Sequence, residues 1–203
     1  MLRNQVLDIF EAMWPTLAIS MVIIISMRIV YLFKNKKEFI VYRELASLIF
    51  IIYVLCLFYV VTFQDVSWSS SNFIPFKEMF RYQFGSRLFF KNVIGNMLLF
   101  MPYGFFTAYY LKLEKPKAVI ILSLLVSTTI EFTQLAIGRV FDIDDIILNF
   151  MGAMVGFYVY YLLNKINHLL PKFLKKPIVY NILMVILLGL VIAYLIGVIE
   201  LGV

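Results

Sequence analysis

The chain has few charged residues, one cysteine and one histidine. Charged residues make up 15% of its 203 positions, against roughly 25% in an ordinary soluble domain. Cys56 is the only cysteine, which excludes a disulfide within the chain. His168 is the only histidine and lies in a predicted loop, so a Ser-His-Asp triad, a Cys-His pair and a His-ligated zinc site are disfavoured. The sequence also contains neither a P-loop nor a Rossmann fingerprint.

Apolar residues take the place of the missing charge. They make up 63% of the chain, and its mean hydropathy is +0.94. Six apolar runs approach or reach the ~20 residues that a helix needs to cross the hydrocarbon core of a bilayer. These runs lie near 12–33, 45–63, 92–111, 118–137, 146–165 and 178–199. The sequence therefore predicts an all-α integral membrane protein, a polytopic bundle of about six transmembrane helices.

The positive charge is concentrated in three short loops. The loops at 34–44, 112–117 and 164–177 carry 11 of the 18 lysine and arginine residues. The positive-inside rule predicts that these loops are cytoplasmic and that both termini lie outside. The basic pI of about 9.3 then suits anionic lipid beside the loops, so no nucleic-acid partner is predicted.

Three polar residues reach one depth in this topology. Asn96 lies ~6 Å, Glu131 ~9 Å and Asn149 ~5 Å from the outer ends of their helices, at 1.5 Å per residue. Ionised carboxylates are costly in a bilayer, so such residues usually face a protein interior or a water-filled cavity. The sequence therefore predicts a polar site in the outer half of the membrane.

Helical spacing predicts which side chains share this site. Residues three or four apart stack on one helix face, which joins Glu131 to Gln134 and Asp142 to Asp145 and Asn149. Asp144 is expected to point away as a solvated loop charge, so Asp144→Asn should be tolerated. Ser123, Ser127 and Asn92 are expected to serve only as hydrogen bonds between helices, and the GxxxG of Gly152 and Gly156 as a close helix contact. Gly138 is expected to end the fourth helix and turn Arg139 back over the site.

The ordered combination of these motifs resembles the VanZ-like family of bacterial membrane proteins. The resemblance covers roughly residues 45–165 and rests on the following pieces: Asn72-Phe-Ile-Pro75-Phe76, Asn92-Val-Ile-Gly95-Asn96 with Pro102 and Gly104, Ser127-x-x-x-Glu131-x-x-Gln134, and Arg139-x-x-Asp142-x-x-Asp145-x-x-x-Asn149 with Gly152 and Gly156. It implies a bacterial cell-membrane protein, and the family takes its name from a protein that gives low-level resistance to teicoplanin. We therefore divide the chain into an N-terminal transmembrane helix with its cytoplasmic loop (1–44), a VanZ-like core (45–165) and a C-terminal accessory helix (166–203).

Carboxylate chemistry remains as the basis for function. We assign catalytic roles to Glu131, Arg139, Asp142 and Asp145, and substrate-binding roles to Asn96, Gln134 and Asn149. Glu131 would transfer a proton and Arg139 would hold a phosphate. No cofactor is predicted, and a divalent cation on Asp142 and Asp145 is a less favoured alternative.

Two functions fit this set of residues equally well. One is an enzyme that modifies a lipid-linked or cell-surface envelope molecule at the outer face. The other is a non-enzymatic protein that binds or transports an amphiphile through the same polar pocket. A purely structural bundle is less favoured. In either case the partner would be a membrane lipid or lipid-linked envelope precursor, and a lipoglycopeptide antibiotic would be affected indirectly.

Overall fold

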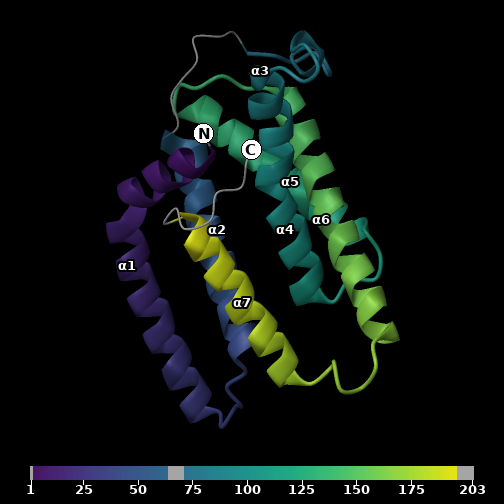
Figure 1. Ribbon diagram of the computed structural model, residues 1–203. Coiled ribbons are helices and arrows are strands. Elements are labelled where there is room, and N and C mark those ends of the chain that lie inside the picture. The colour runs from purple at the N-terminus through teal and green to yellow at the C-terminus, as the bar shows by residue number, and fades with distance from the viewer. Residues whose placement is uncertain (1, 64–70, 196–203) are drawn as a thin grey trace. The chain divides into compact units, whose positions relative to one another are not determined.

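The computed structural model describes residues 2–63 and 71–195, and it is helical (Figure 1). In chain order the elements are α1 (Leu2–Lys34), α2 (Val41–Phe63), the short 3-10 helix η1 (Met79–Arg81), α3 (Arg87–Phe89), the π-helical η2 (Phe90–Ile94), α4 (Gly95–Leu111), α5 (Lys117–Ala136), α6 (Ile143–Leu169) and α7 (Pro177–Leu195). Within these described residues, the only strand-like pairing is an isolated bridge of Asn72 with Asp142. The predicted all-α fold is confirmed.

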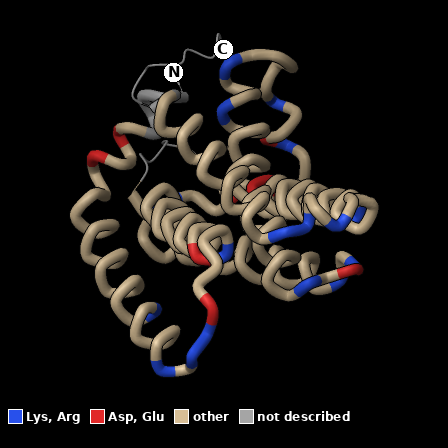
Figure 2. Tube along the Cα trace, turned by 60° about the horizontal axis from the view of Figure 1, so that its bottom comes forward, with Lys and Arg blue, Asp and Glu red and all other residues tan. Residues whose placement is uncertain are grey.

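The six predicted spans correspond to α1, α2, α4, α5, α6 and α7. Four of these helices are long and apolar enough to cross a membrane: residues 7–34 of α1, and α2, α5 and α6. Charged residues lie mainly near the helix ends, and long uncharged stretches separate them (Figure 2). The chain is therefore a helical membrane protein. The last predicted span extends to residue 199, and its final four residues lie outside the described part of the chain.

Local sequence explains where several helices begin and end. The helical run that leads into α4 begins at Arg87 instead of 92, because the Ser86 hydroxyl accepts a hydrogen bond of 3.1 Å from the Phe89 N–H. After α5, Gly138 has φ +82°, and the Arg139 N–H reaches the Gln134 carbonyl at 2.8 Å. A helix end of this kind needs a residue with left-handed backbone angles, and glycine adopts these angles most readily. The prediction that the helix stops there is confirmed.

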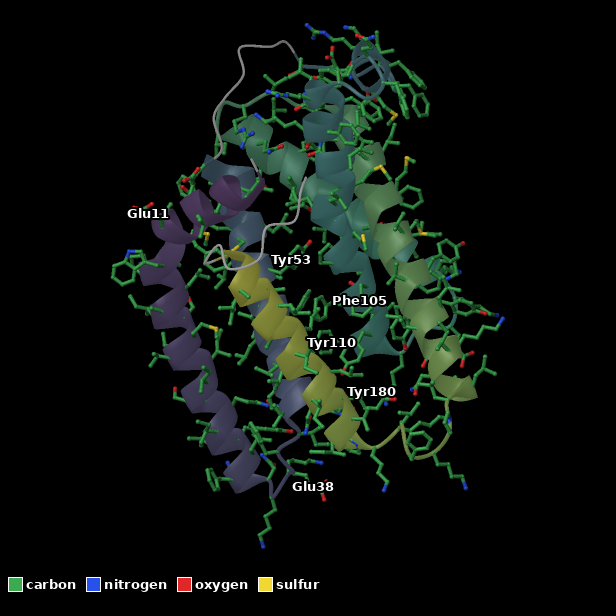
Figure 3. All side chains as sticks on the ribbon, in the orientation of Figure 1. Glu11, Glu38, Tyr53, Phe105, Tyr110 and Tyr180 are labelled. Atoms are coloured by element: carbon green, nitrogen blue, oxygen red, sulfur yellow. The ribbon has the colours of Figure 1, made fainter. Side chains whose placement is uncertain are left out.

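Residues 61–169 form one compact unit in which α6 packs against α4 and α5. Close contact between α4 and α6 depends on three glycines. A Cβ at Gly152 would meet the Met97 carbonyl, one at Gly156 the Met101 carbonyl, and one at Gly104 the Ala153 carbonyl. Met97 and Met101 advance along α4 as Gly152 and Gly156 advance along α6, so the two helices run in the same direction. Further along them, Phe105 of α4, which is labelled in Figure 3, meets Tyr160 of α6 edge to face.

Residues 1–60 and 170–203 form the other unit. Arg28 of α1 makes a bidentate ion pair with Glu44 of α2, at 2.8 and 2.9 Å. At the start of α2, the Tyr42 N–H donates to the Asn181 side chain of α7 at 2.9 Å. The Tyr42 ring lies 5.4 Å from the ring of Tyr180, which is labelled in Figure 3. These contacts join α1, α2 and α7. The division of the chain at 44/45 and 165/166 stays a prediction.

Candidate functional site

Glu131 and Asp142 meet where α5 ends and α6 begins. Glu131 is 2% exposed, and its Oε2 accepts a 2.8 Å hydrogen bond from the Asp142 N–H. Asp142 is the residue before α6, and its Oδ1 accepts the Asp144 N–H at 2.9 Å. This is an N-cap, which satisfies one of the free N–H groups of the first helical turn. Asp142 therefore caps the start of α6. Its carboxylate also belongs to the group formed with Glu131 and Asp145, here called the cluster.

Asn72 joins the preceding loop to this corner. Its backbone N–H donates to the Phe141 carbonyl at 2.8 Å, and its carbonyl accepts the Ile143 N–H at 3.1 Å. Its side chain, in a residue 3% exposed, donates to Asp142 Oδ1 at 2.9 Å. These bonds fix the loop against the start of α6, with the Phe73 and Phe141 rings stacked 5.1 Å apart.

Two amides connect the site to neighbouring helices. Asn96 of α4 donates from its side chain to Asp145 Oδ1 of α6. One turn further along α6, buried Asn149 donates to the Ser127 hydroxyl of α5 at 2.9 Å. The Asn149 side-chain oxygen is also buried, and no described residue donates to it. Asn96 and Asp145 are thus in direct contact, whereas Asn149 and Ser127 form a deeper pair between helices.

Acidic side chains dominate the cluster. Asp145 interacts electrostatically with Glu131, Asp142 and Asp144, and more weakly with Arg139. Asp142 lies outside the membrane segments, and burial raises the pKa of its carboxyl group. The hydrogen bonds from the Asn72 side chain and the Asp144 backbone lower this pKa. Among the described residues, no group of three or more histidine, cysteine or acidic side chains is arranged to hold a metal ion. The cluster is therefore a set of carboxylates whose charges repel one another.

Arg139 and Gln134 share a different partner. The Arg139 guanidinium donates to the Val61 carbonyl in the last turn of α2, and the Gln134 amide donates to the same oxygen at 3.2 Å. In the described part of the chain, no carboxylate lies within ion-pairing distance of Arg139. Its charge still acts on Glu131 and Asp145 at longer range. Both side chains therefore stabilise a helix end, where carbonyl groups lack partners within the helix.

The expectation for Asp144 was wrong. This residue is 1% exposed, and its carboxylate accepts N–H bonds from Phe76, from Glu78 at 2.7 Å and from Met79 at 3.0 Å. The helix spacing did turn Asp144 away from Asp145 and Asn149. However, the loop of residues 72–79 lies on that side and supplies three donors. Asp144 is therefore the buried anchor of this loop.

The sequence assignment omitted Asn72 and Asp144 from the site. A signal for Asn72 was present, because Asn72-Phe-Ile-Pro75-Phe76 was one of the motif pieces. Asp144 carried no comparable signal, since its donors are backbone N–H groups about 65 residues earlier in the chain. Every residue except proline has a backbone N–H group, so the sequence does not show which of these groups will bind a carboxylate.

Comparison with known proteins shows the family of the chain. Residues 50–165 match the VanZ/LLP1 family, and this match spans more than half of the chain. The class defined by the fold is a helical membrane protein with a polar cluster at the end of its helices. The chain belongs to the VanZ/LLP1 family. No curated protein and no solved structure gave a match.

Proposed function

We propose that the protein acts on a lipid-linked or cell-surface envelope molecule at the outer face of the bacterial cell membrane. In doing so it would contribute to low-level resistance to teicoplanin-type lipoglycopeptides. The observation that carries the proposal is the contact between Glu131 and the Asp142 backbone, beside Asp145. Among the described residues, no arginine or lysine forms an ion pair with Glu131, Asp142 or Asp145. Three neighbouring carboxylates without such a partner favour a protonated member, and a protonated carboxyl can act as a general acid.

The other residues of the cluster would position the ligand. Asn96 and Asn149 offer amide groups beside Asp145 and one turn deeper, and the Asn149 oxygen has a free acceptor position within the described structure. Arg139 uses one of its five donors on Val61, so its remaining donors could hold a phosphate. The Gln134 amide donates a hydrogen bond to the same Val61 carbonyl and would orient Arg139.

A non-enzymatic function is the alternative. Glu131 is almost fully buried, so a substrate would reach Asp142 and Asp145, which are partly exposed, before it reached Glu131. A protein that only binds or transports an amphiphile would need no proton transfer at Glu131, only the contribution of Glu131 to the charge around Asp145. In that case the negative charge of the cluster would attract a cationic group of the ligand.

We expect Glu131→Gln to abolish teicoplanin protection while the protein remains folded. Glutamine keeps a side-chain oxygen that can accept the Asp142 N–H but cannot exchange a proton. For an enzyme, turnover should fall ~10²–10⁴-fold with ligand affinity retained. For a binding protein, affinity itself should fall. The measurement is the inhibitory concentration of teicoplanin at matched protein levels, with exposed Glu114→Gln as the control. Full protection by the Glu131→Gln variant would contradict both functions.

Arg139 gives an independent test of whether the cluster acts as one unit. Arg139→Ala should also lose protection, Arg139→Lys should keep more of it, and adding Glu131→Gln to Arg139→Ala should do little further harm. Effects within one functional unit are not additive, and lysine lacks the bidentate geometry of arginine. The three variants are compared in the same resistance assay with expression checked. Additive losses would return Arg139 to a structural role at the end of α2.

The outer location rests on loop charge and is tested by thiol labelling. In a Cys56→Ala background, Gln83→Cys and Lys115→Cys place single thiols at exposed positions before and after α4. An impermeant thiol reagent added to intact cells should label position 83 and leave position 115 unlabelled. After permeabilisation both should react. Labelling of position 115 alone would put the cluster on the cytoplasmic side.

A further inference from the structure

Residues 72–91, here called the aromatic segment, expose large apolar side chains outside the long helices. Phe80 is 80% exposed and Phe84 is 87% exposed. Five further apolar side chains of the segment are at least half exposed: Phe73, Ile74, Phe76, Leu88 and Phe90. Water-soluble surfaces rarely present so many large apolar groups together, and such a patch marks an interaction surface.

The segment is also basic. It carries Lys77, Arg81, Arg87 and Lys91 but only one acidic residue, Glu78. Glu78 is ion-paired with Arg81 at 3.0 Å. Of the remaining three cations, Lys77 and Arg87 lie between exposed phenylalanines and Lys91 directly follows Phe90. This combination of aromatic and basic residues is typical of protein segments that lie in a membrane interface.

Three connections fix the segment close to the ends of membrane helices. Its last residues continue without a break through η2 into α4. Asp144, in the first turn of α6, binds the backbone of residues 76, 78 and 79. Asn72 is bonded to residues 141–143. In Figure 3 the side chains of this segment project outward beyond the end of α4. The ends of membrane-spanning helices lie near the level of the lipid headgroups, so these connections place the segment next to that level.

We propose that the aromatic segment lies in the lipid headgroup region of the protein's own membrane. Its exposed phenylalanines insert toward the acyl chains, and Lys77, Arg87 and Lys91 contact lipid phosphates. An interfacial element of this kind reaches ~5–10 Å below the headgroup boundary. Because Asn72 and Asp142 are bonded, the carboxylate cluster then lies at the depth where a lipid-linked molecule carries its polar group. The insertion itself does not depend on the proposed function.

The test uses spin labels on single cysteines in the Cys56→Ala chain, reconstituted in vesicles of phosphatidylcholine and phosphatidylglycerol. Phe80→Cys and Phe84→Cys report on the segment, and Glu114→Cys is an exposed polar control in the turn between α4 and α5. For each spin label, the rate of collision with oxygen, which concentrates in lipid, is compared with the rate of collision with a water-soluble nickel chelate. We expect the ratio of oxygen to nickel access to be severalfold higher at positions 80 and 84 than at 114.

Two results would overturn the proposal. Nickel access at 80 and 84 equal to that at 114 would mean that the segment lies in water. Low access to both reagents would mean that protein, including a second copy of the chain, covers the segment. The phosphate contacts are tested by changing Lys77, Arg87 and Lys91 together to glutamine. This change should lower the ratio in phosphatidylglycerol vesicles more than in pure phosphatidylcholine, and an equal effect in both would exclude the charge contacts.

Discussion

Asp144→Ala should destabilise the folded protein by about 3 kcal/mol or more, because hydrogen bonds to a charged group contribute ~1.5–3 kcal/mol each and three are lost. The carboxylate accepts N–H groups from Phe76, Glu78 and Met79, and alanine replaces none of these bonds. Asp144→Asn should also be destabilising, because its NH₂ group would face at least one of the three donors. The loop that carries Asn72 would lose its anchor, and protection against teicoplanin should be lost with it.

The neighbouring carboxylate provides a matched control. Asp145→Asn keeps an oxygen that can accept the Asn96 amide, so stability should change little while function is lost. Thermal unfolding of the full chain in detergent separates the two variants, and limited proteolysis reports cleavage within residues 72–91. If Asp144→Asn and Asp145→Asn unfolded at the same temperature as the unmodified protein, the role of Asp144 as an anchor would be wrong.

Gly152→Ala should disrupt the packing of α4 against α6 at a cost of at least about 3 kcal/mol. Extra methyl groups in a packed interior typically cost ~1–3 kcal/mol when side chains can move aside. At Gly152 the new Cβ would meet the Met97 carbonyl and its neighbouring backbone atoms, which can move only if the whole helix shifts. Asn96 precedes Met97, so the contact between Asn96 and Asp145 should be lost as well.

Gly189 in α7 is the matched control. A Cβ there would meet no atom within 4 Å, and alanine is favoured over glycine inside a helix by up to ~1 kcal/mol. Gly189→Ala should therefore leave stability unchanged or slightly raised. Unfolding temperatures in detergent decide between the two sites. Equal behaviour of Gly152→Ala and Gly189→Ala would mean that the two helices do not touch at Gly152.

The helix contact at Gly152 could be predicted from the sequence, whereas the role of Asp144 could not. Helix contacts through small residues follow a local pattern, so Gly152 and Gly156 could be identified from their spacing, and the structure bears this out at Met97 and Met101. The end of α5 could also be read from Gly138, because a positive φ favours glycine. The partners of Arg139 could not be read. An arginine eight residues beyond Glu131 can reach a carboxylate or a helix-end carbonyl, and only the position of Val61 decides which.

The sequence by itself determined the class of protein, the regions of its six long helices and the helix faces that carry Asn96, Glu131 and Asp145. These follow from hydrophobic length and helical periodicity, which are local properties. Only the tertiary structure decided the role of Asp144 and the links of Asn72. Helical spacing shows the direction in which Asp144 points from α6, but its partners are backbone N–H groups of a loop about 65 residues earlier. Whether a carboxylate on that face meets water or backbone donors depends on where the loop lies, and that is a property of the folded chain alone.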